Sequence, residues 1–265
     1  MTAFAGNSLL CRVALKHTSI DAASFTAIRL VSGALMLWLL TSAKRDERAG
    51  HGNWFSAIAL FAYAAGFSFA YLTLSAATGA LLLFGAVQAT MIGHGIAKGE
   101  RLHGVPLAGL LLALAGIVWL FLPGLTAPPL VGSLLMLGAG VAWGVYSLRG
   151  RSGGAPLKVT AGNFLRAVPL ALAMCLLMLV HINLDSAGFL YAIASGALTS
   201  GVGYAIRYTA LPALKATHAA TIQLSVPLLT AVGGIVFLGE AITLRLAVAS
   251  AAILGGIAMV IRKNR

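Results

Sequence analysis

Apolar residues form long blocks along the whole chain, and short polar stretches separate the blocks. Most blocks approach about 20 residues, which is the length that a helix needs to cross a bilayer. They lack the strict alternation that a membrane-spanning strand would show. The pattern therefore predicts ten transmembrane helices, at residues 1–14, 22–40, 54–74, 76–97, 105–122, 130–148, 159–180, 187–211, 216–238 and 244–261.

The first block is shorter than the others. At about 1.5 Å per residue, 1–14 covers about 20 Å of a hydrocarbon core about 30 Å thick. We expect either that apolar residues upstream of Met1 complete this helix or that it is incomplete in the membrane.

The composition agrees with a membrane protein. Apolar residues make up 60% of the 265 positions and charged residues 9%, whereas soluble domains have about 45–50% and about 25%. Because the excess apolar surface must face something other than water, we expect the lipid bilayer to be a partner of an all-α membrane protein.

The formal net charge of +12 would otherwise suggest a nucleic-acid partner, but the basic residues cluster at the ends of the apolar blocks. With ten spans, one side of the membrane receives Lys44, Arg45, Arg48, Lys98, Arg101, Arg149, Arg151, Lys158, Lys215, Arg262, Lys263 and Arg265, and the other side receives Arg12, Lys16 and Arg245. Loops rich in Lys and Arg stay in the cytoplasm. We therefore expect no nucleic-acid partner, and a multi-pass cell-membrane protein with both termini cytoplasmic.

The two halves of the chain resemble each other. At an offset of 137, Arg12 aligns with Arg149 and Arg29 with Arg166; after a three-residue insertion, Gly99-Glu100 aligns with Gly239-Glu240. This predicts two five-helix repeats, 1–125 and 126–265. Because five is odd, the second repeat enters the membrane inverted, an arrangement that supports alternating access to a central site.

Several segments are similar to those of a known family. They are "FAGNSLLCR" from Phe4, "IRLVSGALMLWL" from Ile28, "TGALLLFGAVQATMIGHGIAKGERL" from Thr78, "WGVYSLRGR" from Trp143 and "ATIQLSVPLLTAVGGIVFLGE" from Ala220. In these segments the chain resembles EamA-type members of the drug/metabolite transporter superfamily. The resemblance implies ten helices, cytoplasmic termini, and a central cavity lined by the first four helices of each repeat. Similar members export amino acids, metabolites or drugs.

The acidic residues all lie at or near the ends of the predicted spans: Asp21, Asp46, Glu47, Glu100, Asp185 and Glu240. A carboxylate relay deep in the membrane is therefore not expected. The sequence leaves three transport mechanisms open: facilitated diffusion, exchange, and coupling to an ion through His94 or His218. The histidines and cysteines show no metal-ligand spacing, so we expect neither a metal nor a cofactor.

Arg29 and Arg166 lie about two turns inside their helices at matching repeat positions. A charged residue within the membrane is a candidate functional residue and here would attract an anionic group. Alternatively, each side chain reaches the nearer interface or binds backbone carbonyls at a helix end.

Gln88 lies near the middle of the fourth span, and Gln223 and Ser225 lie in the ninth. Pro227 removes the amide that would bond to the Gln223 carbonyl, so an acceptor is freed there. The two glutamines, with Ser225 and His94, are candidates for substrate binding. Polar side chains in spans also join helices by hydrogen bonds, and for the glutamines both interpretations stay open.

Asn7, Ser195, Thr199, Ser200 and Tyr204 are weaker candidates for lining the cavity; packing is the alternative, particularly for the hydroxyls. The adjacent glycines 201 and 203 interrupt the eighth span. Gly201 and Gly203 either loosen this helix for movement or permit close packing.

These observations together predict a transporter that moves a small organic solute, by export rather than import, through alternating access. A membrane-embedded enzyme is the first alternative, but the chain has no HExxH motif and no paired intramembrane acids. A non-transporting membrane subunit is the second. The sequence leaves the substrate, the coupling ion and the oligomeric state open.

Overall fold

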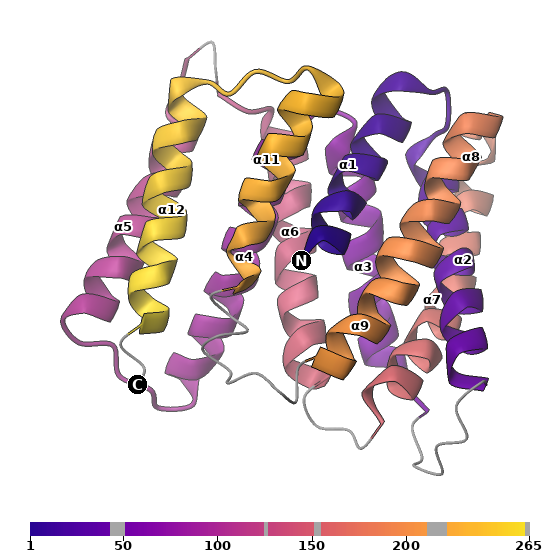
Figure 1. Cartoon of the computed structure of the whole chain (residues 1–265), viewed down its shortest axis with the longest axis horizontal. Helices are drawn as coiled ribbons and strands as arrows, with labels where there is room; N and C mark the ends of the chain where they lie inside the picture. The colour runs from indigo at the N-terminus through magenta and orange to yellow at the C-terminus, as the bar shows by residue number, and fades with distance from the viewer. Residues whose placement is uncertain (43–50, 125–126, 151–154, 211–221, 263–265) are drawn as a thin grey trace.

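The computed structural model describes residues 1–42, 51–124, 127–150, 155–210 and 222–262. Throughout these ranges the regular structure is helical (Figure 1). Helices are expected in lipid because a buried peptide group must find its hydrogen-bond partner within its own segment. Several predicted positions, among them Lys44, Arg151, Lys215 and His218, lie outside the described residues.

The first half of the chain contains α1 (Thr2–His17), α2 (Ala22–Ser42), α3 (Trp54–Tyr71), α4 (Ala76–Ala97) and α5 (Val105–Phe121). The second half contains α6 (Leu130–Arg149), α7 (Pro156–Leu177), η2 (Leu179–His181), α8 (Ser186–Ile193), η3 (Ala194–Val202), α9 (Gly203–Ala210), α11 (Ser225–Leu238) and α12 (Leu244–Arg262).

Seven helical segments in the described ranges are long and apolar enough to cross a membrane. They are Ala22–Ser42, Trp54–Tyr71, Ala76–Ala97, Leu130–Arg149, Pro156–Leu177, Ser186–Ile206 and Leu244–Ile261. Helices α1, α5 and α11 are shorter. The prediction of an all-helical membrane protein is confirmed at this level.

Several predicted boundaries differ from the structure by a few residues, the ends of the first and third spans among them. Helix α1 continues past residue 14 to His17, where the Thr18 hydroxyl donates to the carbonyl of Ala14 and closes the last turn. Helix α3 ends at Tyr71 rather than at 74, because a turn precedes Ser75, the N-cap of α4. Helix α11 begins at Ser225, and the predicted start of this span at 216 lies outside the described residues.

The eighth predicted span is not a continuous α-helix. It begins as α8, continues as η3, which is a π-helix of nine residues, and ends as α9. At Gly196 a side chain would collide with the backbone of Arg29 in α2, so the absence of a side chain lets η3 approach α2 closely.

The helices pack as a bundle with one lateral pair (Figure 1). Helices α5 and α12 form this pair at one side. In the rest of the bundle, α2 packs against α7 and η3, α3 against α6, and α4 against α6 and α11. Helix α1 contacts α11, α8 and η3, which places the N-terminal segment among helices from the second half.

Large apolar side chains cover the outer surface of several helices. Leu111 and Val118 of α5, Leu165 of α7 and Val236 and Phe237 of α11 are all exposed. A water-soluble protein rarely exposes so many large apolar side chains, so lipid is the solvent that fits this exterior.

Asp21 joins two loops at one end of the bundle. Its Oδ1 accepts hydrogen bonds from the backbone N–H groups of Ala23 and Ser24 at the start of α2, and its Oδ2 accepts from Asn183 N. Partial burial would raise the pKa of this carboxyl, but the hydrogen bonds from Ser24, Asn183 and Ala23 outweigh burial and lower the pKa below 3.8. The charged form is thus favoured in the folded state.

We predict that Asp21→Ala lowers stability by about 1 kcal/mol, as loss of a helix N-cap does. Because the folded-state pKa is depressed, this contribution is present above the unfolded-state pKa and disappears as the pH falls through the folded-state value. Melting temperatures of wild type and variant, measured in detergent at pH 7 and again in acid below the folded-state pKa of Asp21, should therefore differ at pH 7 and converge in acid. An equal difference at both pH values would contradict the assignment.

Candidate functional site

A buried pocket lies where helices from both halves of the chain meet. It is lined by Phe4, Asn7, Arg29, Leu30, Leu60, Tyr63, Ala64, Trp143, Phe164, Thr199, Ser200 and Tyr204. These residues belong to α1, α2, α3, α6, α7, η3 and α9. The open space within it is about 10 Å³, roughly the room for one water molecule.

Asn7 of α1 connects the two halves by hydrogen bonds. Its Oδ1 accepts from the Ser195 hydroxyl at 2.7 Å and from the Thr199 hydroxyl at 3.2 Å, both in η3. Its Nδ2 donates to the Tyr63 hydroxyl at 3.4 Å. The Asn7 amide is thus held from both sides, by hydroxyls of the second half at its oxygen and by a hydroxyl of the first half at its nitrogen.

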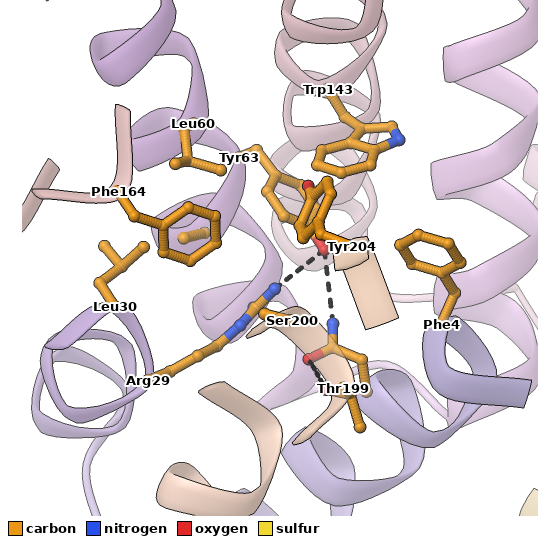
Figure 2. Close-up of a pocket in the computed structure, with 12 residues that line it drawn as sticks. Phe4, Arg29, Leu30, Leu60, Tyr63, Trp143, Phe164, Thr199, Ser200 and Tyr204 are labelled. Atoms are coloured by element: carbon orange, nitrogen blue, oxygen red, sulfur yellow. Dashed lines mark hydrogen bonds between the residues drawn. The ribbon is translucent and has the colours of Figure 1, made fainter. Parts of the chain in front are cut away.

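Arg29 of α2 enters the pocket from another side and points towards its centre (Figure 2). Its side chain is 3% exposed, and Nη2 donates to the Tyr63 hydroxyl at 3.0 Å. The guanidinium carbon lies 5.2 Å from the ring centre of Tyr63 and 5.0 Å from that of Phe67. Aromatic faces at this distance attract a cation and stabilise part of its charge.

Aromatic rings surround the polar groups. Trp143 of α6 lies 4.7 Å from Tyr63 and 5.6 Å from Tyr204, measured between ring centres. Phe4 packs edge-on against Tyr204 and Trp143, and Phe164 approaches Tyr204 from α7. In Figure 2, Phe4 and Phe164 lie on opposite sides of this group. Such a set of few polar groups among aromatic rings is typical of small-molecule sites.

Of the side chains predicted from the sequence, the pocket gathers Asn7, Arg29, Thr199, Ser200 and Tyr204. Ser195 is fully buried and reaches Asn7 from behind. Gln88, Gln223, His94, Ser225 and Arg166 do not line the pocket.

The two arginines at matching repeat positions differ. Arg166 of α7 donates from Nη1 to the carbonyls of Gly162, at 3.0 Å, and of His51. It therefore fits the alternative interpretation, in which the side chain binds backbone carbonyls. Arg29 binds a tyrosine hydroxyl in the interior instead.

Gln88 and His94 both lie on α4. Gln88 is 5% exposed, and its Nε2 has no hydrogen-bond partner among the described residues. His94 is exposed in the last turn of the helix. One interpretation of Gln88 was that its side chain joins two helices by a hydrogen bond. No such bond is seen in the described part of the chain.

The segment before α11 is interrupted where Pro227 predicts it. Helix α11 begins at Ser225, so Pro227 sits in its first turn, where its missing amide costs no hydrogen bond. Gln223 is half-buried just before the helix, and the Ser225 hydroxyl donates to the carbonyl of Ile222.

Gly201 lies in the π-helical η3, and Gly203 is the first residue of α9. A side chain at Gly201 would meet Met36 of α2, and one at Gly203 would meet Ala3 of α1. Close packing is thus visible at both positions. The π-helical backbone, which is common near functional sites, coincides with the predicted irregularity of this span.

Sequence reasoning missed Phe4, Tyr63, Trp143 and Phe164. Each stands inside an apolar block and reads as an ordinary core residue. For Tyr63 and Trp143 a weak signal existed, because a buried hydroxyl or indole N–H needs a partner and its presence in a span indicates a polar neighbour.

An ion pair closes one end of the bundle beyond the pocket. Arg12 Nε of α1 lies 3.0 Å from Oε1 of Glu240, and both side chains are largely buried. Glu240 Oε2 accepts from the backbone N–H of Ala76 at the start of α4, and Arg12 Nη1 donates to the carbonyl of Tyr71 at the end of α3. Helix α1 is thereby joined to the end of α3, the start of α4 and the turn that follows α11.

Comparison with known proteins places this architecture in a family. Residues 130–262 match the EamA-like transporter family. An uncharacterized protein of Pseudomonas aeruginosa is 58% identical over 264 residues, which cover 98% of this chain and 91% of that protein. A crystal structure covers 100% of this chain and 96% of its own, with a TM-score of 0.70 and 22% identity, and so shares the fold.

The threonine/homoserine exporters RhtA of Salmonella typhimurium and of Escherichia coli K12 are each 34% identical over 141 residues. Those residues are 50% of this chain and 46% of the exporters, so the match spans about half the length of each protein. The resemblance drawn from the sequence motifs is confirmed: the chain belongs to the EamA-like transporter family.

Proposed function

We propose that this protein moves a small organic solute across the cell membrane and that the buried pocket is the substrate site. The observation that carries the proposal is the position of the pocket, because α1, α2 and α3 of the first half meet α6, α7, η3 and α9 of the second around it. A site shared by two halves opens to either side when the halves move relative to each other.

The pairs of packed helices support an inverted repeat of 1–125 and 126–265 with ten spans. In the repeat, α1 corresponds to α6, α3 to the span that contains η3, and α4 to α11. The contact of α3 with α6 therefore corresponds to that of η3 with α1, and the contact of α4 with α6 corresponds to that of α11 with α1. The pairs α5–α12, α2–α7 and α4–α11 map onto themselves. Such exchange is expected of a two-fold axis in the membrane plane.

The two Gly-Glu pairs support the same repeat. Gly99 and Gly239 both have positive φ, of 95° and 61°, a conformation that favours glycine. The backbone N–H of the following glutamate then returns to its own helix, Glu100 to the carbonyl of Gly95 and Glu240 to that of Gly234. Both glutamates thus follow a glycine of positive φ that ends their helix, although the returning bond spans five residues at Glu100 and six at Glu240.

These turns suggest two gates. Glu240 pairs with Arg12 at the end of the bundle where α4 begins, whereas the matching Glu100 is exposed just after the other end of α4, a helix that packs against α6, which ends at Arg149. In the alternate conformation, Glu100 would pair with Arg149 while Arg12 and Glu240 separate. With about 10 Å³ of space, the pocket in the present conformation is too small for an organic solute, so a gate must open before the solute enters.

The named relative indicates the class of solute. RhtA is an exporter of threonine and homoserine, and small polar amino acids are therefore the first solutes to test, in the export direction. Family membership supports a transporter over an embedded enzyme or a non-transporting subunit. The charge distribution supports the inner membrane, with the ends that carry Lys98, Arg149 and Lys158 in the cytoplasm.

Transport is tested by counterflow in proteoliposomes loaded with unlabelled L-threonine or another amino acid of a panel. Wild type should accumulate labelled solute above protein-free vesicles. Asn7→Leu should reduce the rate at least tenfold, because the amide that joins Ser195 to Tyr63 is lost, and should also lower the melting temperature. Asn7→Ser is the milder variant, should Leu prevent folding.

Gln88→Leu is the matched control in this assay. Since Gln88 lies outside the pocket with an unpaired Nε2, the rate should stay near that of wild type and the melting temperature should not fall. A Gln88→Leu protein that is folded but inactive would return Gln88 to the site. Failure of every solute in the panel to exchange would contradict the proposed function.

The gate is tested by access to a cysteine placed in the pocket. The tested protein carries Phe4→Cys as the cysteine to be labelled and Cys175→Ala to remove a native thiol. Cys11 is kept because it is fully buried. A membrane-impermeant maleimide added from the periplasmic side should label the introduced cysteine slowly. Glu240→Gln should speed labelling severalfold, because the ion pair and its hydrogen bond to Ala76 are weakened. The matching Glu100→Gln should not speed labelling from this side. Equal labelling in all three proteins would contradict the gate.

The orientation has its own test. Reporters fused after Arg265 and near Pro128 should give opposite signals, cytoplasmic at the C-terminus and periplasmic near Pro128. A periplasmic C-terminus would overturn the assignment of sides and the ten-span topology together.

A further inference from the structure

We infer that Arg29 and Tyr63 together form a binding site for a single carboxylate, so that the pocket selects monocarboxylates and zwitterions over uncharged or doubly negative solutes. The inference rests on the proposed pocket and adds to it the chemical class of the substrate. It starts from the positive charge of Arg29, which has no counter-charge among the described residues.

Arg29 is buried, and no carboxylate of the described residues lies within 4.0 Å of it. Its Nη2 is bound to Tyr63, but its Nη1 has no hydrogen-bond partner among those residues. Burying a cation with unfilled donors is costly. The aromatic faces of Tyr63 and Phe67 offset part of that cost. An anionic ligand that binds Nη1 would supply the missing charge and the missing acceptor at once.

The hydroxyl of Tyr63 adds a second donor. It accepts one hydrogen bond from Arg29 Nη2 and one from Asn7 Nδ2. A phenol oxygen that accepts two hydrogen bonds still has its own hydrogen to donate. Arg29 therefore offers an N–H donor from Nη1, and the neighbouring Tyr63 hydroxyl offers an O–H donor. A carboxylate has two oxygens and can accept one hydrogen bond from each of them.

The chain of hydrogen bonds behind Tyr63 runs in one direction. The Ser195 hydroxyl donates to Asn7, and Asn7 donates to Tyr63. Successive donors aligned in this way polarise one another, which strengthens the last donor towards an acceptor. Ser195 and Asn7 thus act as positioning residues for the donor that would contact the ligand.

The pocket favours one negative charge over two. Arg29 is the charged residue among those that line it; the others are aromatic, apolar, hydroxyl or amide side chains. A dianion would bring one uncompensated charge into a buried site, which is unfavourable. In an opened conformation, the faces of Phe4, Trp143 and Tyr204 would contact an ammonium group or an apolar side chain on the opposite side of the same molecule.

Arg166 provides an internal control. It occupies the matching position of the other half, but its Nη1 already binds the carbonyls of His51 and Gly162. Replacing Arg166 should disturb a contact between loop and helix, and replacing Arg29 should remove a ligand contact.

The experiment measures ligand-induced thermal stabilisation of the purified, full chain in nanodiscs. The probes are L-threonine, L-homoserine, L-alanine, L-phenylalanine and L-lactate, each beside its carboxamide, with O-phospho-L-threonine as the dianion. For wild type, at least one carboxylate should bind at least about tenfold more tightly than its carboxamide, the effect of a charge-assisted hydrogen bond, and O-phospho-L-threonine should bind more weakly than L-threonine.

Arg29→Gln should abolish the preference for the carboxylate, Arg29→Lys should keep part of it, and Tyr63→Phe should reduce it. Arg166→Gln should retain it. Without ligand, Arg29→Gln should melt at the same temperature as wild type or higher, because an unpaired buried charge is removed. A structural arginine would instead lower the melting temperature and leave the ratio of carboxylate to carboxamide affinity unchanged.

The outcomes separate this inference from the proposed function. Equal binding of carboxylates and carboxamides by wild type, or no binding of any carboxylate, overturns the inference, even if uncharged solutes exchange in proteoliposomes. Binding that depends on Arg29, with no counterflow of any solute, upholds the carboxylate site and overturns the proposed transport.

Discussion

A peptide group in lipid must have its hydrogen bond supplied by the protein, and the whole structure is arranged around this requirement. Within the helices it is met automatically. At the ends it is met by charged side chains: Glu240 accepts from Ala76 N, Arg12 donates to the carbonyl of Tyr71, and Arg166 donates to that of His51. The charged residues are few, and these stand where backbone groups would otherwise be unpaired.

Arg29 departs from this rule, since its guanidinium meets side chains rather than backbone carbonyls. The polar groups around it are also in an unusual place for a membrane protein, buried between helices rather than at their ends. Polar groups in such a position are expensive and are commonly functional. The contrast of Arg29 with Arg12 and Arg166 is thus the physical reason for proposing that the pocket is a binding site.

The sequence predicted the helical membrane fold well, because the lengths of the apolar blocks and the breaks between them are local properties. It could not distinguish Arg29 from Arg166. Both lie about two turns inside a helix, and only the packed structure brings a free carbonyl, that of His51, within reach of one of them. Similarly, Gln88 and Asn7 are both amides in apolar segments, but only Asn7 meets hydroxyls of η3. Such differences depend on contacts between segments distant in sequence.

The π-helical turns of η3 have a mechanical consequence. A π turn closes its hydrogen bond one residue later than an α turn, so η3 accommodates extra residues as a wide segment between α8 and α9. Shifting that segment by one residue along the chain would rotate the side chains it passes by about 100°, the angle between neighbouring residues of an α-helix. Ser195 and Thr199 lie within it. Moving the π-helical segment in this way would change the direction of the two hydroxyls that bind Asn7, while the ends of the span stay in place.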